Sequence, residues 1–332
     1  NAEPLTGDAN AMGFKAYNLA RMAAIGLPVP PAFVLGTGYC RDYLKAEKKP
    51  GGELLAASMR RIESGSGLTF GGARKPLLVS VRSGAPVSMP GMMETILNVG
   101  LTEATLRGLL RMTGNPRLVW DSYRRLVQSF ATVVHGAPAQ PFEAVLEAYL
   151  KQGGAARAQE LDARLLAAVA RDYLELYHKL TGADFPQDPL EQLEAAVRAV
   201  FRSWLSPRAA EYRRLHQLDE TVGTAVTVQR MVFGNAGGSS GSGVAFTRNP
   251  ATGENRLYMD FLFNAQGEDV VSGRHALHDA EQLAVILPQV MQHILSVSRA
   301  LEAEFKDVQE FEFTVQDGRL YLLQTRTGKR TP

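Results

Sequence analysis

The sequence predicts an α+β fold, because two kinds of segment alternate along the 332-residue chain. Both ends are rich in β-branched and aromatic residues and are interrupted by glycine and proline. The middle, from Glu103 to about Ala183, is rich in Ala, Leu, Arg and Glu and repeats its apolar residues at helical spacing. Because a chain of this length can form two or three packed units, we expect β-containing units with a helical insertion.

The first predicted β-strand of interest is the apolar run Leu77–Val81, which is followed at once by Arg82. Glycine and proline punctuate residues 83–91, so that backbone N–H groups can lie there without partners. Such a loop suits phosphate, and a guanidinium group binds phosphate oxygens in pairs and keeps its charge. A single arginine after a strand is also common in surface ion pairs, so the pattern alone leaves both interpretations open.

Several helices, rather than one, are predicted over residues 103–183. Pro138 and Pro141 interrupt the periodic pattern once, and the pair Gly153-Gly154 interrupts it again. The segment Glu191–Phe201 predicts a further amphipathic helix. We assign the apolar stripes of these helices to core packing.

After the helices, Thr224–Val232 predicts a strand rich in β-branched residues. The Gly/Ser-rich residues 234–243 follow, and this composition alone slightly favours a flexible linker. The next apolar segment carries Arg248 near its end, and a strand of this kind after a glycine loop suits a lid over nucleotide phosphates. In a lid, glycines allow the backbone to approach phosphate oxygens.

The C-terminal segment Glu310–Arg326 predicts a β-hairpin, with Phe311, Phe313 and Val315 on one face. The turn decides which residues share the other face. A three-residue loop with Gly318 in the left-handed conformation would place Glu310, Glu312, Gln324 and Arg326 together. A two-residue Asp-Gly turn would instead put Gln324 across the sheet.

The one-sided arrangement of the hairpin is chemically suited to a nucleotide. Oxygen ligands hold Mg²⁺ that bridges the phosphates, while an arginine neutralises the remaining charge. A solvated strand face with alternating charges is the structural alternative.

Segments spread over nearly the whole chain resemble, in order, motifs of the pyruvate, phosphate dikinases in their N-terminal ATP-grasp nucleotide-binding domain. The most specific segment is RSGAPVSMPGMMETILNVGL at residues 82–101. The others are KAYNLARM (15–22), GLPVPPAF (26–33), NPRLVWDSYRR (115–125), FRSWLSPR (201–208), VQRMVFGN (228–235), GSGVAFTRNP (241–250), NAQGED (264–269) and YLLQTR (321–326). The related phosphoenolpyruvate synthases and rifamycin phosphotransferases carry a different loop after their Arg-Ser-Ser, so the string SMPGMM favours the dikinase branch.

This resemblance implies an ATP-grasp fold of two α/β lobes with a helical insertion. The first lobe is expected over residues 1–101 plus 188–232, and the helical insertion over 102–187. The second lobe, with the Gly-rich lid and the metal hairpin, is expected over residues 233–332.

The resemblance also implies which residues bind ATP and Mg²⁺. For the Gly/Ser-rich residues 234–243, it favours a lid over a flexible linker. Two residues, Arg82 and Arg326, are expected to be catalytic, the latter as a clamp on the transferred group. Lys15 and Arg82 are expected to bind phosphate, and Glu312 and Gln324 are expected to bind Mg²⁺, with Glu310 near the metal or nucleotide. Glu268 is expected at the ribose or the lid. Backbone groups near Gln229, Met231 and Val232 are expected at the adenine, and Gly241 and Gly243 are expected in the lid.

The sequence departs from the family pattern at two places. The family generally has aspartate where Glu310 stands, so that the longer side chain can alter the geometry at the metal or ribose. Its Gly-Gly-Lys-Gly run is here Gly13-Phe-Lys-Ala, with Phe14 and Ala16 in place of glycines. Lys15 is retained, but its backbone approach to phosphate is expected to differ.

By resemblance, the chain is expected to be the nucleotide-binding domain of a pyruvate, phosphate dikinase-like enzyme. It would transfer the β,γ-pyrophosphoryl group of ATP to a histidine on another domain, en route to phosphoenolpyruvate. That phosphohistidine acceptor domain is absent from this chain, since none of its six histidines lies in a matching motif. The alternatives are a phosphotransferase of the phosphoenolpyruvate synthase or rifamycin phosphotransferase type, and a non-catalytic ATP-binding module.

Composition limits the remaining possibilities. With 36 Lys and Arg against 34 Asp and Glu, the formal charge of +2 gives no reason to expect nucleic acid or a membrane as a partner. The single cysteine, Cys40, excludes an intrachain disulfide and is best explained as a small buried hydrophobe. No run reaches the apolar length of a membrane span and no leader is visible, so a cytoplasmic location is expected.

Overall fold

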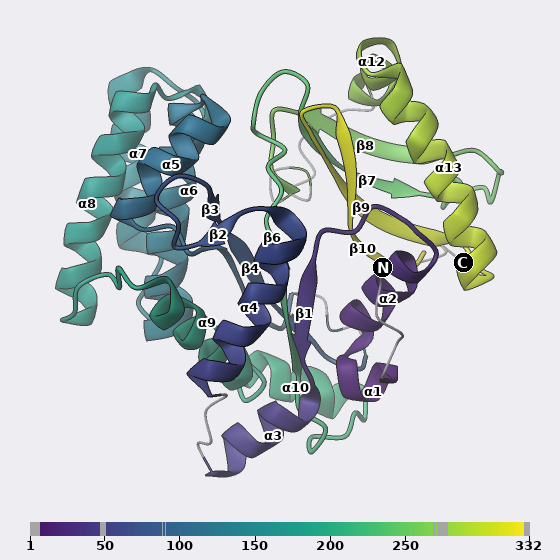
Figure 1. The fold of residues 1–332 in the computed structure, drawn as a ribbon, viewed down its shortest axis with the longest axis horizontal. Helices are drawn as coiled ribbons and strands as arrows, with labels where there is room; N and C mark the ends of the chain where they lie inside the picture. The colour runs from purple at the N-terminus through teal and green to yellow at the C-terminus, as the bar shows by residue number, and fades with distance from the viewer. Residues whose placement is uncertain are drawn as a thin grey trace. The chain divides into compact units, whose positions relative to one another are not determined.

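The structure is a computed structural model that describes residues 7–46, 51–87, 89, 91–267, 270 and 278–328. Its helices and antiparallel sheets confirm the predicted α+β class (Figure 1). Internal contacts divide the chain into two compact units. The central unit contains Asn10–Gly13 and Pro31–Met231, and the C-terminal unit contains Phe14–Pro30 and the described residues from Val232 onward.

The central unit is built on the four-stranded sheet β1-β6-β4-β5, in which all neighbours are antiparallel. Its strands are β1 (Ala32–Leu35), β4 (Val79–Gly84), β5 (Thr95–Val99) and β6 (Ala225–Arg230), and a two-stranded parallel sheet pairs β2 (Thr69–Phe70) with β3 (Pro76–Leu77). Its helices are α1 (Ala9–Met12, at the boundary of the units), α3 (Thr37–Ala46), α4 (Gly52–Ser66), α5 (Glu103–Thr113), α6 (Pro116–Ser129), α7 (Gln140–Gly153), α8 (Ala163–Thr181), α9 (Pro189–Ser203) and α10 (Pro207–Leu215), with a π-helix at Phe130–Val134 and a 3-10 turn at Ala158–Glu160.

Helix α9 covers one face of this sheet because alternate strand residues there are apolar. Val79, Val81, Val226 and Val228 are fully buried on this face. The opposite face presents polar residues of the same strands. The sheet therefore has one apolar face and one face that carries polar side chains.

Helices α5 to α8 form the expected helical segment of the central unit, as seen together in Figure 1. Helix α7 has Pro141 in its first turn and is followed by Gly154 in the left-handed conformation, so the predicted breaks are confirmed. Cys40 is also buried as predicted, and this burial raises the pKa of its thiol to about 11.

The C-terminal unit is a four-stranded antiparallel sheet in the order β10-β9-β7-β8, packed against helices on one face. The strands are β7 (Gly241–Phe246), β8 (Tyr258–Phe263), β9 (Gln309–Gln316) and β10 (Arg319–Thr327), and the helices are α2 (Phe14–Ala24), α12 (His278–Ile286) and α13 (Pro288–Phe305). Phe261, Phe311 and Phe313 form the centre of its core with Ile294 and Leu301 of α13. The other face of β9 and β10 carries the polar residues of the hairpin.

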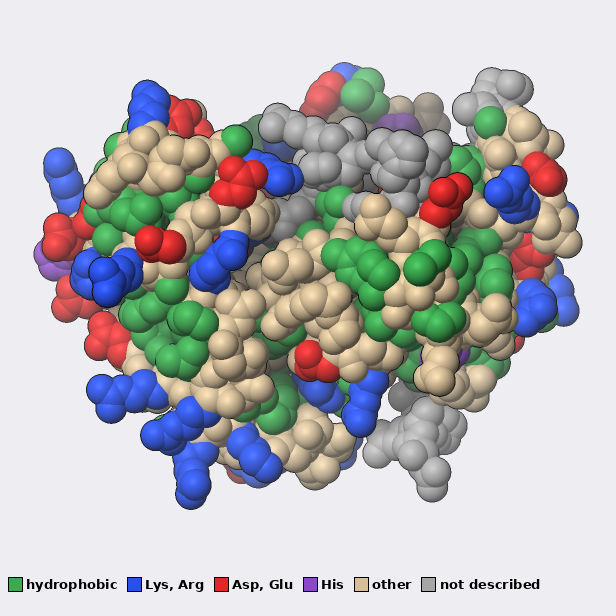
Figure 2. Space-filling view, turned by 90° about the horizontal axis from the view of Figure 1, so that it is seen from above, with side chains coloured by type: hydrophobic (Ala, Val, Ile, Leu, Met, Phe, Trp, Pro, Cys, Tyr) green, Lys and Arg blue, Asp and Glu red, His purple; other side chains and the backbone are tan. Residues whose placement is uncertain are grey.

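One segment near the N-terminus packs with the C-terminal unit, and the lobe boundaries expected from the sequence stay a prediction. Residues 14–30, expected in the first lobe, pack with the residues after Val232, because Leu19 and Met22 of α2 belong to the core of the C-terminal unit. Both signs of charge are scattered among hydrophobic side chains over the face shown in Figure 2. In the part of the chain that the structure describes, no helix is both long and apolar enough to cross a membrane.

Candidate functional site

The β9–β10 hairpin places four predicted site residues on one face by means of an irregular register that the sequence analysis did not predict. Asp317 and Gly318 form a two-residue turn, both with positive φ, and Gln316 pairs with Arg319. A β-bulge at Leu323 then shifts the register, so that Gln324 pairs with Glu312 and Arg326 with Glu310. The shared face therefore arises from a bulge and not from a three-residue loop.

Two side-chain pairs occupy this face. Gln324 Nε2 donates to Glu312 Oε1 over 3.1 Å, and Arg326 donates to Glu310 in a close ion pair. The hydrogen bond from Arg326 to Glu310 raises the pKa of the guanidinium, which therefore carries a fixed charge. Glu310 is largely buried, whereas Glu312, Gln324 and Arg326 are half-buried and accessible from one side.

The neighbouring strand β7 contains the two glycines expected in the lid. Gly241 and Gly243 turn toward the core, where a Cβ would lie 2.2 Å from Phe261 Cζ and 2.4 Å from Phe313 Cζ respectively. Their backbones also pair with β8 on one side and β9 on the other. Ring packing thus explains why both positions lack a side chain, and nucleotide contacts by these glycines stay a prediction.

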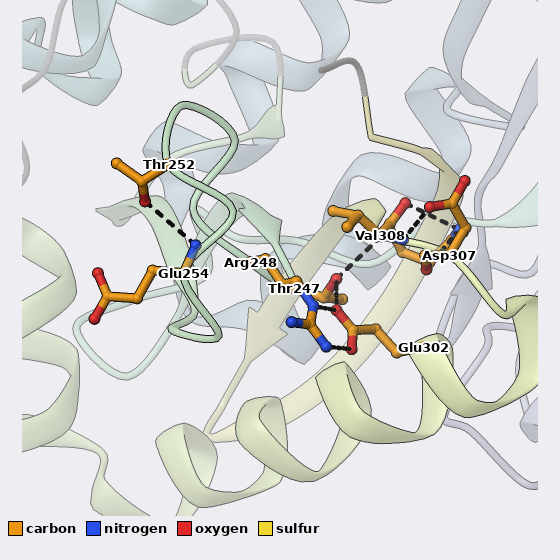
Figure 3. A network of polar contacts seen from close by, with 8 residues as sticks. Thr247, Arg248, Thr252, Glu254, Glu302, Asp307 and Val308 are labelled. Carbon is orange, nitrogen blue, oxygen red and sulfur yellow. Dashed lines mark hydrogen bonds and ion pairs between the residues drawn. The ribbon is translucent and has the colours of Figure 1, made fainter. Parts of the chain in front are cut away.

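Arg248 follows β7, and its side chain is bound to a carboxylate of the same unit. Its Nε and one terminal nitrogen bind both oxygens of Glu302 on α13 at 2.8 and 3.0 Å, and Thr247 donates to the same carboxylate at 2.8 Å (Figure 3). The backbone amide of Gln309 donates to Thr247 Oγ1. Thr247 and Arg248 together therefore join the end of β7 to β9 and α13 within the C-terminal unit.

Lys15 lies in the first turn of α2, which begins directly after Gly13, a residue with a φ of +76°. Helix α2 packs on β10, where the Asn18 side-chain amide donates to the carbonyl of Thr325 at 3.0 Å. The lysine thus belongs to the helix that contacts the strand carrying Gln324 and Arg326.

Arg82 lies inside β4 and not in the loop after it, which corrects the expected end of the strand. The strand continues to Gly84, and Arg82 pairs with Thr227 of β6 and Thr95 of β5. The Arg82 side chain is half-buried and makes no hydrogen bond or ion pair with a residue that the structure describes. It is thus a cation on the polar face of the sheet, available to a ligand.

Thr227 is a polar residue at this face that the sequence analysis did not select. It is 1% exposed, and its Oγ1 has no hydrogen-bond partner among the described residues. The signal was present, because strand alternation over Thr224–Val232 puts Thr227 on the same face as Gln229. A buried unpaired hydroxyl beside Arg82 is a second group that can bind a ligand.

The segment after β6 has the backbone groups that an adenine requires. The Met231 amide donates to the carbonyl of Leu78, and Ser80 lies opposite Gln229 with its hydroxyl 3.4 Å from the Gln229 carbonyl. The Met231 carbonyl and the Val232 amide make no hydrogen bond within the described part of the chain, although both residues are buried. Glu268, the expected ribose carboxylate, lies outside the described residues.

The donor set fits Mg²⁺ only in combination with phosphates. Among the described residues, no group of three His, Cys, Asp or Glu side chains could hold a metal. Mg²⁺ is commonly held by one or two carboxylates while phosphates and water complete its octahedron, which Glu312 and the Gln324 carbonyl oxygen can satisfy. Arg326 Nε is buried without a hydrogen-bond partner among the described residues, so it has a donor left for a ligand oxygen.

Comparison with known proteins identifies the family of the chain. The family model for the pyruvate phosphate dikinase AMP/ATP-binding domain matches residues 52–279. Pyruvate, phosphate dikinase of Clostridium symbiosum is 44% identical over 326 residues, covering 97% of this chain and 37% of that protein. Pyruvate, phosphate dikinase 2 of Zea mays is 48% identical over 324 residues (96% and 36%), and the Rhizobium meliloti (strain 1021) enzyme is 44% identical over 345 residues (99% and 38%).

The chain therefore spans a little over a third of the length of these relatives, whose names describe the whole proteins. The resemblance read from the sequence motifs is confirmed, since the family model covers more than half of the chain. From its fold, its nucleotide-suited residues and this match, the chain belongs to the pyruvate phosphate dikinase AMP/ATP-binding domain family.

Proposed function

We propose that this chain binds Mg-ATP and transfers the β,γ-pyrophosphoryl group to a histidine on another domain. The observation that carries the proposal is the polar face of the β9–β10 hairpin, where Glu312 with Gln324 and Glu310 with Arg326 form two adjacent pairs. One pair supplies oxygen ligands for a cation, and the other supplies a fixed positive charge for a phosphate. Membership in an AMP/ATP-binding domain family supports the same ligand.

The proposed transfer breaks the bond between the β-phosphorus and the oxygen that bridges it to the α-phosphate. The electron pair of that bond stays on the oxygen of AMP, while a histidine nitrogen forms a new bond to the β-phosphorus. Catalysis then depends on positioning and on stabilising negative charge. Arg82 and Arg326 are suited to this task because neither guanidinium loses its charge near neutral pH.

In this proposal Glu312 and Gln324 would hold Mg²⁺, which would supply positive charge against the phosphate oxygens. Lys15 and Arg82 contact phosphate oxygens. The Met231 carbonyl accepts a hydrogen bond from the adenine amino group, and the Val232 amide donates to a ring nitrogen. Thr227, with its unpaired hydroxyl, is a further donor beside Arg82.

The onward steps belong to the same proposal, because the relatives are named pyruvate, phosphate dikinases. The terminal phosphoryl group would pass from the histidine to inorganic phosphate, giving pyrophosphate, and the remaining phosphoryl group would pass to pyruvate, giving phosphoenolpyruvate. The acceptor histidine would be supplied by a separate domain, in the same chain or in another. A cytoplasmic location also stays a prediction, and one Zea mays relative is named as chloroplastic.

The experiment that tests the proposal supplies this chain with Mg²⁺, ATP and a histidine-bearing domain produced from a relative. Labelled phosphate should appear on that domain from both [β-³²P]ATP and [γ-³²P]ATP, with AMP as the product. Arg82→Ala and Arg326→Ala should abolish labelling, whereas Arg157→Ala, an exposed arginine paired with Glu160, should not. Label from γ-phosphate alone would exclude pyrophosphoryl transfer, and normal labelling by both variants would exclude the assigned arginines.

A further inference from the structure

The central unit has an open cavity that none of the predicted nucleotide-binding residues lines. Its volume is about 960 Å³, and residues of the segment between β2 and β3 and of helix α5 line it. Thr69 and residues 72–75 form one side, and Arg111 and Met112 of α5 form the other. The cavity thus combines two chain segments within one compact unit.

Three of the lining side chains are cations, namely Arg74, Lys75 and Arg111, and none of the lining residues is acidic. All three are exposed, and within the described residues none of their side chains forms a hydrogen bond or an ion pair. Like charges around one cavity repel each other, so the arrangement is unfavourable without an anion.

Two other exposed arginines of the same unit are neutralised by neighbouring carboxylates. Arg157 binds Glu160 at 3.0 Å, and Arg214 binds Glu211 through two nitrogens at 2.6 and 2.9 Å. What marks the cavity is that three cations without such a partner among the described residues line one space.

Close backbone packing fixes the two sides of the cavity against each other. A Cβ at Gly108 of α5 would lie 2.5 Å from the Ala73 carbonyl oxygen and 2.8 Å from Pro76 Cδ. The glycine thus lets the segment before β3 lie directly on the helix, one turn before Arg111. On the other side, the Thr69 amide donates to the Lys75 carbonyl at 2.9 Å, which closes the segment on itself. The backbone positions of the cations are therefore set before any ligand binds.

We infer that this cavity binds a phosphate dianion, either free or as part of a phosphomonoester. Two guanidinium forks and one ammonium group match the oxygens and the charge of such a ligand. The exposed Met112, 43% accessible, offers an apolar contact for the organic part of a phosphomonoester. The inference is independent of the proposed nucleotide site.

The test is calorimetric titration with inorganic phosphate and, separately, with phenyl phosphate. Each titration is done in an Arg82→Gln background, which removes one of the phosphate ligands of the proposed nucleotide site. In this background, Arg74→Gln/Arg111→Gln should weaken phosphate binding by about tenfold or more. The control Arg157→Gln/Arg214→Gln removes two positive charges elsewhere on the unit and should leave the affinity nearly unchanged.

Tighter binding of phenyl phosphate than of inorganic phosphate would identify a phosphomonoester as the ligand, and equal binding would identify free phosphate. No phosphate binding in the Arg82→Gln background, or equal weakening by both double variants, would overturn the inference. Gly108→Ala keeps all three cations but forces the 72–76 segment away from α5, so it should also weaken binding while circular dichroism reports an intact fold.

Discussion

Gln324 faces Glu312 across the β9–β10 hairpin because Leu323 forms a bulge between Leu322 and Gln324. A regular ladder from the two-residue turn would have put Gln324 on the side of the phenylalanine core. The bulge reverses the alternation at that point and brings the amide 3.1 Å from the carboxylate. Both residues assigned to Mg²⁺ thus owe their common face to one extra residue in β10.

The pair of Glu310 and Arg326 is predicted to stabilise the C-terminal unit. Glu310→Gln removes the carboxylate charge beside a half-buried guanidinium and should lower the free energy of unfolding by about 1–3 kcal/mol. Urea unfolding measures the change. Glu160→Gln, in an exposed pair, should have little effect, and equal effects of the two substitutions would contradict the structural role of Glu310.

The glycines of β7 are predicted to be required by the core. Gly243→Ala would place a Cβ 2.4 Å from Phe313 Cζ and should cost about 1–3 kcal/mol of stability, measured by urea or thermal unfolding. Gly237→Ala is the matched control, because a Cβ there meets nothing within 4 Å. A smaller side chain at position 313 should relieve the strain, so Phe313→Leu is expected to rescue Gly243→Ala partly. Unchanged stability of Gly243→Ala would show that the packing account is wrong.

Stability in acid is predicted to depend on Glu302. The hydrogen bond from Arg248 holds the pKa of this carboxyl below its ordinary value of 4.5. Because the folded pKa lies below the unfolded one, the contribution is present above about pH 4.5 and is lost as the pH falls through the folded pKa. Glu302→Gln should therefore flatten the fall in unfolding free energy below pH 4.5, whereas the exposed Glu53→Gln should leave the curve unchanged. Identical curves for all three proteins would refute this role.

Arg82 is predicted to serve ligand binding and not stability. Since its side chain has no partner in the described part of the chain, Arg82→Gln should change the free energy of unfolding by less than about 0.5 kcal/mol. ATP affinity should fall by about tenfold or more in calorimetry. Arg213→Gln provides the contrast, because Arg213 donates to the Trp204 carbonyl and stacks on its ring, so that loss should destabilise the unit. A destabilised Arg82→Gln protein would falsify the assignment.

The sequence predicted the elements of the fold well where local patterns determine them. The helices over 103–183, the strand after Thr224 and the C-terminal hairpin were all identified from periodicity and turn residues. The family of the chain followed from ordered motifs. The position of Arg82 was predicted only approximately, because the strand continues through Ser83 and Gly84 by pairing with Val226 and Ala225.

Features that depend on distant contacts were not predictable. Arg248 was expected at a phosphate lid, but its partner Glu302 lies 54 positions later in the sequence, on α13. The bulge at Leu323 has no glycine to mark it, so the turn alone gave two alternatives for Gln324. Gly243 ends a Gly/Ser-rich segment whose composition is typical of a loop. Only the contact of its position with Phe313 explains why it lies in a central strand.

The most direct test of the central claim is calorimetric titration of ATP into the chain with and without Mg²⁺, repeated with Glu312→Gln. The account predicts saturable binding to the wild-type chain that strengthens with Mg²⁺, and a loss of this Mg²⁺ dependence in the variant. ATP binding that Mg²⁺ strengthens equally in both proteins, or no ATP binding by the wild-type chain, would contradict it.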